Sequence, residues 1–467
     1  MNITIANNIQ IKEPTNELLE WANNNLIVDN PLYKQLKLLG KEDTIRFRHI
    51  PEKMKLFSTR GTTITLPFGT LYAIWPLIKE QPMVLNFNQN NDISIKNDMP
   101  TLEPYDYQEK AIQAMIKAKG GVLVSSCGSG KTFMGIEIVR RLGRKTLWLC
   151  HTGDLLRQAK QDFENQYPNV KIGLTTEGEL NIGEDVTIST IQTLINIDPD
   201  LYKNEFDIVV CDECAHVTSS PTQMKMFGTI LSNIPARYKF GLTATPYRSD
   251  GMVKSMYAYI GCNPQGEFNP TYKIDSSETK KINALHQRVD INSGYDMDKM
   301  YELYDSSGMI NYNNLINELS SNDERNNKIC ANIIKLQKEG RKQVVLCSRV
   351  NQCESLVEKL KNEGISAELC VGKVSNKKRN EILNGLNWDV LVATYALLKE
   401  GISIKELDTL HMVTPIKDPA TVVQCAGRIE RYLPNKKTPI IFDYVDIDIP
   451  YCEKAYVYRR RALKKRF

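Results

Sequence analysis

A glycine-rich turn between an apolar strand and a helix is the feature that most constrains this chain. Residues 121–124 read Gly-Val-Leu-Val, typical of a buried parallel strand, and residues 133–142 place apolar side chains at helical spacing. The turn between them, residues 125–132, reads Ser-Ser-Cys-Gly-Ser-Gly-Lys-Thr. Glycines in such a turn let backbone N–H groups surround a phosphate chain at the positive end of the following helix. The sequence therefore predicts a phosphate-binding loop at the edge of an α/β sheet.

The polar residues of this loop have distinct expected tasks. The Lys131 ammonium group can reach the β- and γ-phosphates of a nucleoside triphosphate, and the Thr132 hydroxyl can ligate Mg²⁺. The backbone groups expected to surround the phosphates belong to Ser126, Cys127, Gly128, Ser129 and Gly130. The alternative is a plain glycine turn between a core strand and a helix, which the strand–turn–helix context disfavours. We therefore predict a nucleoside triphosphate site.

Two carboxylates follow a second apolar strand further along the chain. Residues 208–211 read Ile-Val-Val-Cys, and Asp212 and Glu213 come directly after them. In an open α/β sheet the carboxyl ends of the strands face the ligand crevice. Asp212 is therefore expected beside the Mg²⁺ held by Thr132, and Glu213 where it can activate an attacking water. The pair predicts hydrolysis of the bound nucleotide.

Length, charge and cysteine usage restrict the class of protein. A chain of 467 residues can form two or three domains, and a formal net charge of +5 requires local basic patches to hold a polyanion. The first residues lack the basic and apolar segments of a signal peptide, and no apolar run is long enough to cross a bilayer. The scattered cysteines favour reduced thiols. We expect a cytoplasmic protein without a membrane partner.

Alternating strand and helix patterns predict two doubly wound parallel-sheet domains. The expected order is a small N-terminal α+β module, a first α/β domain with the phosphate loop, a connector, a second α/β domain and a basic C-terminal segment. Their expected bounds are 1–100, 101–260, 261–322, 323–450 and 451–467. The second α/β domain has no phosphate loop, so one nucleotide is expected in the cleft between the two α/β domains.

Both ends of the chain carry basic clusters whose role the residues leave open. In the N-terminal module, residues 17–39 read as mostly helical and residues 46–49 alternate like a strand. The basic side chains that follow fit either a DNA-contacting strand pair or a solvated β face, and they are Lys53, Lys55 and Arg60. At the other end, residues 459–466 are strongly basic and fit either a duplex-DNA contact or a flexible solvated tail.

Short motifs follow one another along the two α/β domains in a distinctive order. In the first domain they are Tyr107-Gln108, residues 125–132, His151-Thr152-Gly153, residues 190–194 (Thr-Ile-Gln-Thr-Leu), residues 212–216 (Asp-Glu-Cys-Ala-His) and residues 242–246 (Leu-Thr-Ala-Thr-Pro). In the second they are residues 347–349 (Cys-Ser-Arg), Ala393-Thr394, residues 400–403 (Glu-Gly-Ile-Ser) and residues 424–431 (Gln-Cys-Ala-Gly-Arg-Ile-Glu-Arg). This series resembles the superfamily 2 helicases over about residues 102–450.

The resemblance implies two RecA-like domains that bind ATP and Mg²⁺ and hydrolyse the ATP. The catalytic residues implied in the first domain are Lys131, Asp212 and Glu213, and the implied metal ligands are Thr132 and Asp212. Gln108 is expected to face the adenine edge, because its amide group both donates and accepts hydrogen bonds. Gly401 is expected to contact the nucleotide from the second domain.

The last motif supplies the catalytic residues implied in the second domain. Residues 424–431 read as one helix, which would place Arg428 and Arg431 on the same face. Their guanidinium groups would neutralise charge on the γ-phosphoryl group, and arginine fingers of this kind contribute on the order of 10³–10⁵ in rate. By resemblance, Gln424 helps to position the attacking water.

Nucleic acid is expected across both α/β domains. The resemblance assigns sequence-blind, salt-sensitive phosphate contacts to Thr152, Thr190, Gln192, Ser348, Arg349 and Thr394. The residues expected to couple hydrolysis to the grip on the strand are His216, Thr243 and Thr245. ATP binding would close the cleft between the domains and hydrolysis would reopen it, which would move the protein along the strand.

Two further stretches indicate which subgroup of the superfamily 2 helicases the chain resembles. Residues 246–251 (Pro-Tyr-Arg-Ser-Asp-Gly) and 442–446 (Phe-Asp-Tyr-Val-Asp) are similar to XPB-type and phage UvsW-type DNA translocases. We therefore expect a phage-encoded, monomeric DNA helicase of the host cytoplasm that unwinds or branch-migrates forks, R-loops or Holliday junctions during replication, recombination or repair. The alternatives are an RNA helicase of the DExH type, the motor subunit of a restriction complex, and an ATP-gated DNA clamp that does not hydrolyse.

Overall fold

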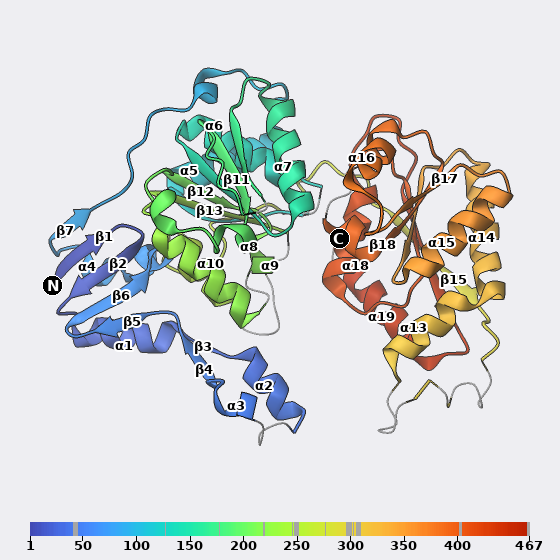
Figure 1. The fold of residues 1–467 in the computed structure, drawn as a ribbon, viewed down its shortest axis with the longest axis horizontal. Coiled ribbons are helices and arrows are strands. Elements are labelled where there is room, and N and C mark those ends of the chain that lie inside the picture. Colours follow the sequence, from blue (N-terminus) through green and yellow to red (C-terminus); the bar gives the residue numbers. More distant parts are fainter. Residues whose placement is uncertain are drawn as a thin grey trace. The chain divides into compact units, whose positions relative to one another are not determined.

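The computed structural model describes residues 1–40, 45–126, 128–176, 178–217, 220–244, 246, 252–275, 277–295, 301, 303–304, 310–400 and 404–464. The chain divides into two units, one of residues 1–126 and 130–278 and the other containing residues 279–467. Each unit holds one parallel sheet (Figure 1). Within the described residues, no helix combines the length and the apolar character that crossing a membrane requires.

The first unit begins with a small α+β module. Its main sheet has the strand order β5-β6-β2-β1-β7. These strands are β5 (Ser58–Arg60), β6 (Thr63–Pro67), β2 (Asn8–Lys12), β1 (Asn2–Ile5) and β7 (Met83–Leu85). A separate pair is formed by β3 (Ile27–Asp29) and β4 (Lys53–Lys55). The helical elements are α1 (Asn16–Asn25), α2 (Pro31–Leu38), α3 (Ile45–Arg48), α4 (Leu71–Ile78), η1 (Phe68–Thr70) and η2 (Ser94–Asn97).

The strand predicted for residues 46–49 is wrong. Helix α3 occupies residues 45–48, and the Ile50 N–H continues the turn by donating to the Phe47 carbonyl oxygen at 3.0 Å. The Phe47 ring lies 4.6 Å from the ring of Tyr33 in α2. This contact between helices outweighs the local alternation of polar and apolar residues, because β propensity depends strongly on context.

The core of the N-terminal module continues into the rest of the first unit. Ile3, Ile11 and Ile64 of the module belong to one buried cluster with Met252 and Ala258. The Cys262 N–H donates to the Gly69 carbonyl oxygen at 2.8 Å, and a β-carbon at Gly69 would lie 2.5 Å from the Tyr257 carbonyl oxygen. Glycine is therefore required where η1 meets helix α11 (Val253–Ile260). The module is packed against α11, which covers one face of the parallel sheet of its unit.

The parallel sheet of the first unit has the order β10-β11-β9-β12-β13-β8-β14. Its strands are β8 (Gly120–Val124), β9 (Thr146–Cys150), β10 (Ile172–Thr175), β11 (Val186–Thr190), β12 (Ile208–Cys211), β13 (Tyr238–Thr243) and β14 (Tyr272–Lys273). One face is covered by α5 (Asp106–Ala118), α6 (Lys131–Leu142) and α7 (Gly153–Gln166). The other carries α8 (Ile191–Leu194), α9 (Cys214–Val217), α10 (Pro221–Asn233) and α11 (Val253–Ile260), and η3 (Pro199–Leu201) follows α8.

The parallel sheet of the second unit has the order β15-β20-β19-β16-β18-β17. Its strands are β15 (Leu285–Ile291), β16 (Gln343–Cys347), β17 (Ala367–Cys370), β18 (Val390–Thr394), β19 (Thr409–Met412) and β20 (Ile440–Asp446). Helices α14 (Asp323–Gln337) and α15 (Val350–Asn362) pack on one face. The opposite face holds α16 (Asn376–Gly385), α17 (Tyr395–Glu400), α18 (Pro419–Ile429) and α19 (Pro450–Lys464), and α13 (Tyr312–Ser321) precedes α14.

The predicted fold class is confirmed: two parallel-sheet α/β domains and a small N-terminal α+β module. The stretch predicted as a connector supplies β14 to the first sheet and β15 to the second. The C-terminal segment is a helix over residues 450–464, with Arg459 and Leu463 buried. A flexible solvated tail, which was one of the two predicted alternatives, is wrong for this part of the chain.

Candidate active site

The predicted phosphate loop joins the carboxyl end of β8 to the first turn of α6. Gly128 and Gly130 have φ angles of 82° and 86°, in the left-handed region that glycine adopts without strain. A β-carbon at Gly130 would lie 2.4 Å from Gln108 Nε2, so a larger residue there would displace the Gln108 side chain. Lys131 and Thr132 begin α6, where backbone N–H groups and the helix dipole favour an anion. Cys127 lies outside the described residues.

Gln108 is held against this loop by its own helix. It is 5% exposed, and its Oε1 accepts a hydrogen bond from the Tyr105 N–H at 2.9 Å. This hydrogen bond directs the amide nitrogen toward Gly130. The contact between Gln108 and adenine stays a prediction. The structure places the Gln108 side chain beside the phosphate loop.

The acidic pair follows the central strand β12. The Asp212 N–H donates to the Leu149 carbonyl oxygen at 2.9 Å, and the Glu213 N–H donates to Asp212 Oδ1 at 3.0 Å. Glu213 has a φ angle of 47°, so the backbone turns sharply immediately after the strand. Because β12 is parallel to its neighbours β9 and β13, both carboxylates lie at the same edge of the sheet as the end of β13.

Electrostatics connect the acidic pair to the phosphate loop. Lys131 Nζ lies 3.5 Å from Glu213 Oε1. Burial, together with the neighbouring Glu213 carboxylate, raises the pKa of Asp212 to about 7, and the Lys131 charge acts in the opposite direction. An added cation would offset the cost of ionising the buried Asp212 carboxylate. The Asp212 carboxylate and the Thr132 hydroxyl are therefore suitable ligands for Mg²⁺.

These donors suit a metal that also binds phosphate oxygens. Within the described part of the chain, no group of three or more His, Cys, Asp or Glu side chains could hold a metal ion. Mg²⁺ usually binds one or two carboxylates together with substrate phosphates and water. The residues fit Mg²⁺ bound together with a nucleotide.

Thr243 links the end of β13 to the beginning of the phosphate loop. Thr243 is buried, pairs in register with Val124, and its carbonyl oxygen accepts from the Ser125 N–H at 3.1 Å. A backbone shift at the loop therefore reaches Thr243 directly. Of the other predicted coupling residues, His216 has only its backbone described, in α9, and Thr245 lies outside the described residues.

The predicted nucleic-acid contacts of the first unit gather at one edge of its sheet. Thr152 caps α7, and its hydroxyl accepts from the Leu155 N–H at 3.3 Å. Thr190 caps α8 and pairs in register with Cys150 at the end of β9. Gln192 is exposed on α8. These side chains lie at the carboxyl ends of neighbouring strands, the same edge that carries Asp212.

The predicted contacts of the second unit also gather at a sheet edge. Thr394 pairs with Cys347, and the Ser348 N–H donates to Thr414 Oγ1 at 3.0 Å. Gly401 lies outside the described residues.

Helix α13 holds Arg349, a contact that the sequence did not predict. The Arg349 guanidinium group donates to Asn317 Oδ1 at 2.7 Å and to Asn313 Oδ1 at 3.0 Å. The two asparagines stand one turn apart on α13, in the stretch predicted as a connector. The spacing of Asn313 and Asn317, one helical turn apart, is the one sequence signal that could have identified them as a pair on one helix face.

The prediction that residues 424–431 form one helix is wrong at its end. Helix α18 stops at Ile429, and Arg431 forms an isolated antiparallel bridge with Lys281. Gln424 and Arg428 remain on the helix, one turn apart. Arg431 therefore does not share the helix face of Arg428.

Glu430 explains why the helix ends there. Its carbonyl oxygen accepts from the Ile282 N–H and its Oε1 accepts from the Ala284 N–H, both at 2.9 Å. Glu430 is 3% exposed. These bonds fix the backbone next to Arg431 against the segment that leads into β15. No sequence pattern predicts these hydrogen bonds, because the partners lie far apart along the chain.

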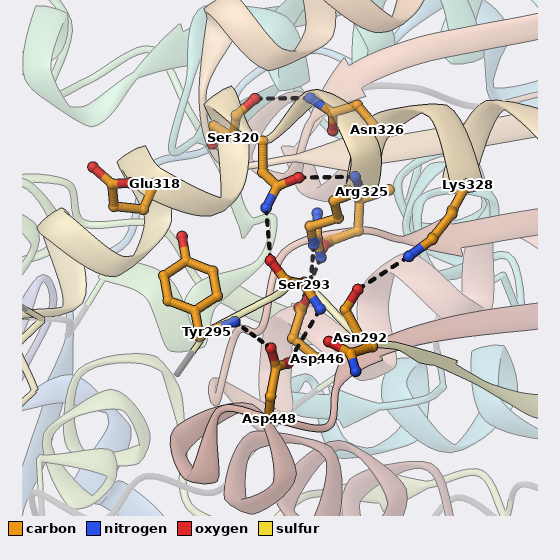
Figure 2. Close-up of polar contacts among 12 residues, drawn as sticks. Asn292, Ser293, Tyr295, Glu318, Ser320, Arg325, Asn326, Lys328, Asp446 and Asp448 are labelled. Carbon is orange, nitrogen blue, oxygen red and sulfur yellow. Dashed lines mark hydrogen bonds and ion pairs between the residues drawn. The ribbon is translucent and has the colours of Figure 1, made fainter. Parts of the chain in front are cut away.

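The Phe-Asp-Tyr-Val-Asp stretch of β20 uses its two carboxylates to hold buried arginines. Asp446 accepts from Arg325 Nε at 2.7 Å, and the same carboxylate accepts from the Ser293 hydroxyl (Figure 2). Asp443 accepts from Arg459 Nη2 at 2.6 Å. All of these charged side chains are buried and paired, which indicates a structural role in the second unit.

Two protein families match the chain. The family described as "Type III restriction enzyme, res subunit" matches residues 101–248, and the family described as "Helicase conserved C-terminal domain" matches residues 324–432. The matches lie on the two parallel-sheet domains.

Curated relatives include proteins of a virus, a phage and an archaeon. The ATP-dependent RNA helicase L396 of Acanthamoeba polyphaga mimivirus is 26% identical over 352 residues, covering 74% of this chain and 64% of that protein. The ATP-dependent DNA helicase uvsW of Enterobacteria phage T4 is 24% identical over 367 residues, covering 74% and 69%. The DNA 3'-5' translocase XPB2 of Sulfurisphaera tokodaii is 31% identical over 197 residues, covering 40% and 43%. The chain thus spans less than two thirds of the L396 and XPB2 proteins.

Among solved structures, that of S. cerevisiae Dbp5 bound to RNA and ADP BeF3 has a TM-score of 0.54 at 15% identity, covering 85% of this chain and 92% of that chain. This likeness concerns the fold, two RecA-like domains.

Proposed function

The chain belongs to the superfamily 2 helicases, whose members hydrolyse ATP, and we propose that it is an ATP- and Mg²⁺-dependent DNA helicase or translocase that remodels branched DNA. The observation that carries the proposal is the position of Lys131 Nζ, 3.5 Å from Glu213 Oε1, between a phosphate loop and the buried Asp212. A nucleotide-binding protein without turnover needs the loop but not the acidic pair.

The residues of the first unit prepare the γ-phosphate for attack. The loop N–H groups and Lys131 hold the phosphate chain, and the Thr132 hydroxyl and Asp212 carboxylate hold the metal. Bound Mg²⁺ would neutralise charge on the phosphate oxygens. Glu213 accepts a proton from the attacking water, and Lys131 Nζ lies close to its carboxylate.

The residues of the second unit complete the reaction. Gln424 positions the water, and Arg428 and Arg431 supply positive charge to the γ-phosphoryl group as charge develops there. Arg431 lies outside α18 and is anchored through the backbone of residues 430 and 431. We propose that Arg431 acts as an arginine finger and that the segment before β15 determines its position.

Coupling to the strand passes through the sheet edges. Thr243 contacts the phosphate loop by way of Ser125, and Thr152, Thr190 and Gln192 stand at the same sheet edge. The second unit contributes phosphate contacts from Ser348, Arg349 and Thr394. Two further residues couple hydrolysis to strand binding, and they are His216 and Thr245. Such phosphate contacts hold a strand without reading its sequence.

DNA as the substrate is favoured by two of the relatives, which are named as a DNA helicase and a DNA translocase. A branched substrate is favoured by the N-terminal module, where Lys53 and Lys55 stand exposed on β4 and Lys55 Nζ lies over the ring of Phe57. The Arg-x-Asp-Gly stretch that first suggested this group, residues 248–251, lies outside the described residues. We propose a monomer that acts in replication, recombination or repair, in the host cytoplasm if the protein is phage-encoded.

An RNA helicase is the second candidate function, because one relative is named as an RNA helicase. A restriction-complex motor is a third, because the first family takes its name from a restriction enzyme subunit.

The test is ATP-dependent strand separation on linear, forked and four-way DNA and on RNA duplexes of matched sequence. The proposal expects faster separation of the forked and four-way DNA than of the linear duplex. Separation of RNA that exceeds separation of every DNA would favour the second candidate. Equal rates on all DNA substrates would reject the preference for branches.

A further inference from the structure

Helix α19 has a buried inner face and a cationic outer face. Its buried residues are Cys452, Ala455, Arg459, Ala462 and Leu463. Arg459 fixes the helix to Asp443 of β20, and Ala462 and Leu463 enter the core of the second unit. The outer residues are exposed, and they are Lys454, Val457, Tyr458, Arg460, Arg461 and Lys464. The outer face is therefore held in a fixed position.

The outer cations lack carboxylate partners among the residues that the structure describes. Within the described part of the chain, none of Lys454, Arg460, Arg461 and Lys464 forms an ion pair, and Glu453, the one acidic residue of the helix sequence, pairs with Arg288. Lys417 lies close by. Burial lowers the pKa of Lys417, and the Lys454 charge lowers it further. Cations that repel one another in this way favour a bound polyanion.

Aromatic rings stand among these cations. Lys417 Nζ lies 3.6 Å from the ring centroid of Tyr451 and 5.9 Å from that of Tyr458. Tyr458 is 51% exposed. Cations beside an exposed ring are typical of surfaces that bind single strands, where bases stack on the ring and phosphates meet the cations.

The same surface continues to the sheet edge that carries Ser348. The Tyr451 ring lies 5.8 Å from the ring of Tyr312. Burial raises the pKa of Tyr312, and the neighbouring Ser348 side chain acts in the opposite direction. Ser348 is a predicted phosphate contact directly after β16. Neighbouring side chains thus lead from Ser348 across Tyr312 and Tyr451 to the outer face of α19.

We propose that the outer face of α19, together with Lys417, binds the nucleic-acid strand as it continues from Ser348. Lys454, Tyr458 and Arg461 lie at positions i, i+4 and i+7, on one face of the helix. Lys454 and Arg461 contact phosphates, and a base stacks on Tyr458. This inference rests on the proposed action on nucleic acid.

The test measures binding of a fluorescein-labelled oligo-dT strand to the full-length protein at several salt concentrations. Lys454→Ala/Arg461→Ala should weaken binding and reduce the slope of log K against log [salt] by about 0.7 for each lost contact. Tyr458→Ala should weaken binding about tenfold, since stacking contributes ~1–3 kcal/mol per base, and Tyr458→Phe should restore it. The matched control is Lys335→Ala/Lys338→Ala, which removes two exposed lysines near the end of α14.

Each outcome has a definite meaning. A change of slope in the α19 variant alone, with an unchanged melting temperature, supports the proposal. Equal affinity and equal slope in the α19 variant and the control would overturn it and leave the helicase proposal intact, because the native protein would still bind the strand. If the native protein binds neither DNA nor RNA, the proposed function itself fails.

Discussion

The Glu430 carboxylate accepts a hydrogen bond from the Ala284 N–H at 2.9 Å. The same residue receives the Ile282 N–H at its carbonyl oxygen, and its neighbour Arg431 bridges to Lys281. The segment before β15 and the proposed arginine finger therefore form one local structure. Any movement of residues 281–284 is passed to the Arg431 backbone through these bonds.

Glu430→Ala should lower kcat for ATP and leave the KM for ATP almost unchanged. Loss of the carboxylate leaves the Ala284 N–H unsatisfied, which costs about 1–3 kcal/mol, and frees the backbone beside Arg431. Glu430→Gln retains an oxygen acceptor and should restore most of the rate. Steady-state kinetics of both variants, with the exposed Glu363→Ala as the control, checks this. A rise in KM without a fall in kcat would contradict it.

Arg431→Ala should bind ATP and hydrolyse it poorly. The expected loss of rate is on the order of 10³, because the guanidinium group acts on charge that develops in the transition state. Nucleotide binding is measured with a fluorescent ATP analogue and turnover by phosphate release. Arg428→Ala serves as the comparison, since Arg428 lies within α18 and Arg431 does not. Weak binding together with normal turnover at saturating ATP would argue against a finger.

Lys239 should make a contribution to the stability of the first unit that increases as the pH rises from about 7 toward 10. Lys239 is 1% exposed and donates to the Leu231 carbonyl oxygen at 2.8 Å, and burial lowers its pKa from 10.5 to about 7. In this pH window the unfolded chain holds a proton that the folded chain has lost, so unfolding takes up a proton and becomes harder at higher pH.

Lys239→Met should remove this contribution, because methionine cannot titrate. Thermal melting of the variant and of the native protein at pH 7, 8 and 9 measures the difference. The exposed Lys225→Met on α10 is the control. Parallel melting curves for the native protein and Lys239→Met across this range would contradict the assignment.

Lys53→Ala/Lys55→Ala should reduce unwinding of forked DNA more than DNA-stimulated ATP hydrolysis. Both lysines lie exposed on β4, outside the main sheet of the module. Deleting residues 1–100 is a poorer test, because the core of the module includes Met252 and Ala258 of the same unit, and the deletion would expose them. The control is Lys12→Ala/Lys79→Ala, which replaces two other exposed lysines of the module. An equal loss of unwinding and hydrolysis would reject branch recognition by the module.

The phosphate loop and the acidic pair could be predicted because each is a local pattern at the end of an apolar strand. The glycines at 128 and 130 have the positive φ angles that the loop requires, and the strand before Asp212 is central in its sheet. Parallel strands end at a common edge, so residues separated along the chain were expected near one another, and Lys131 Nζ lies 3.5 Å from Glu213 Oε1.

The supports of the site could not be predicted in the same way. Glu430 finds its partners in residues 282–284, and Arg349 finds its partners on α13. Neither pairing leaves a periodic pattern in the sequence. The end of α18 was missed for this reason, because helix propensity alone continues through Glu430 and tertiary hydrogen bonds end the helix earlier.

ATP hydrolysis by Lys131→Ala, with and without DNA, tests the central claim most directly. The native protein should hydrolyse ATP faster when DNA is added, and Lys131→Ala should show no hydrolysis above background under either condition. Lys117→Ala, an exposed lysine of α5, should behave like the native protein. Hydrolysis by Lys131→Ala at the native rate would contradict the assigned site and the motor built on it.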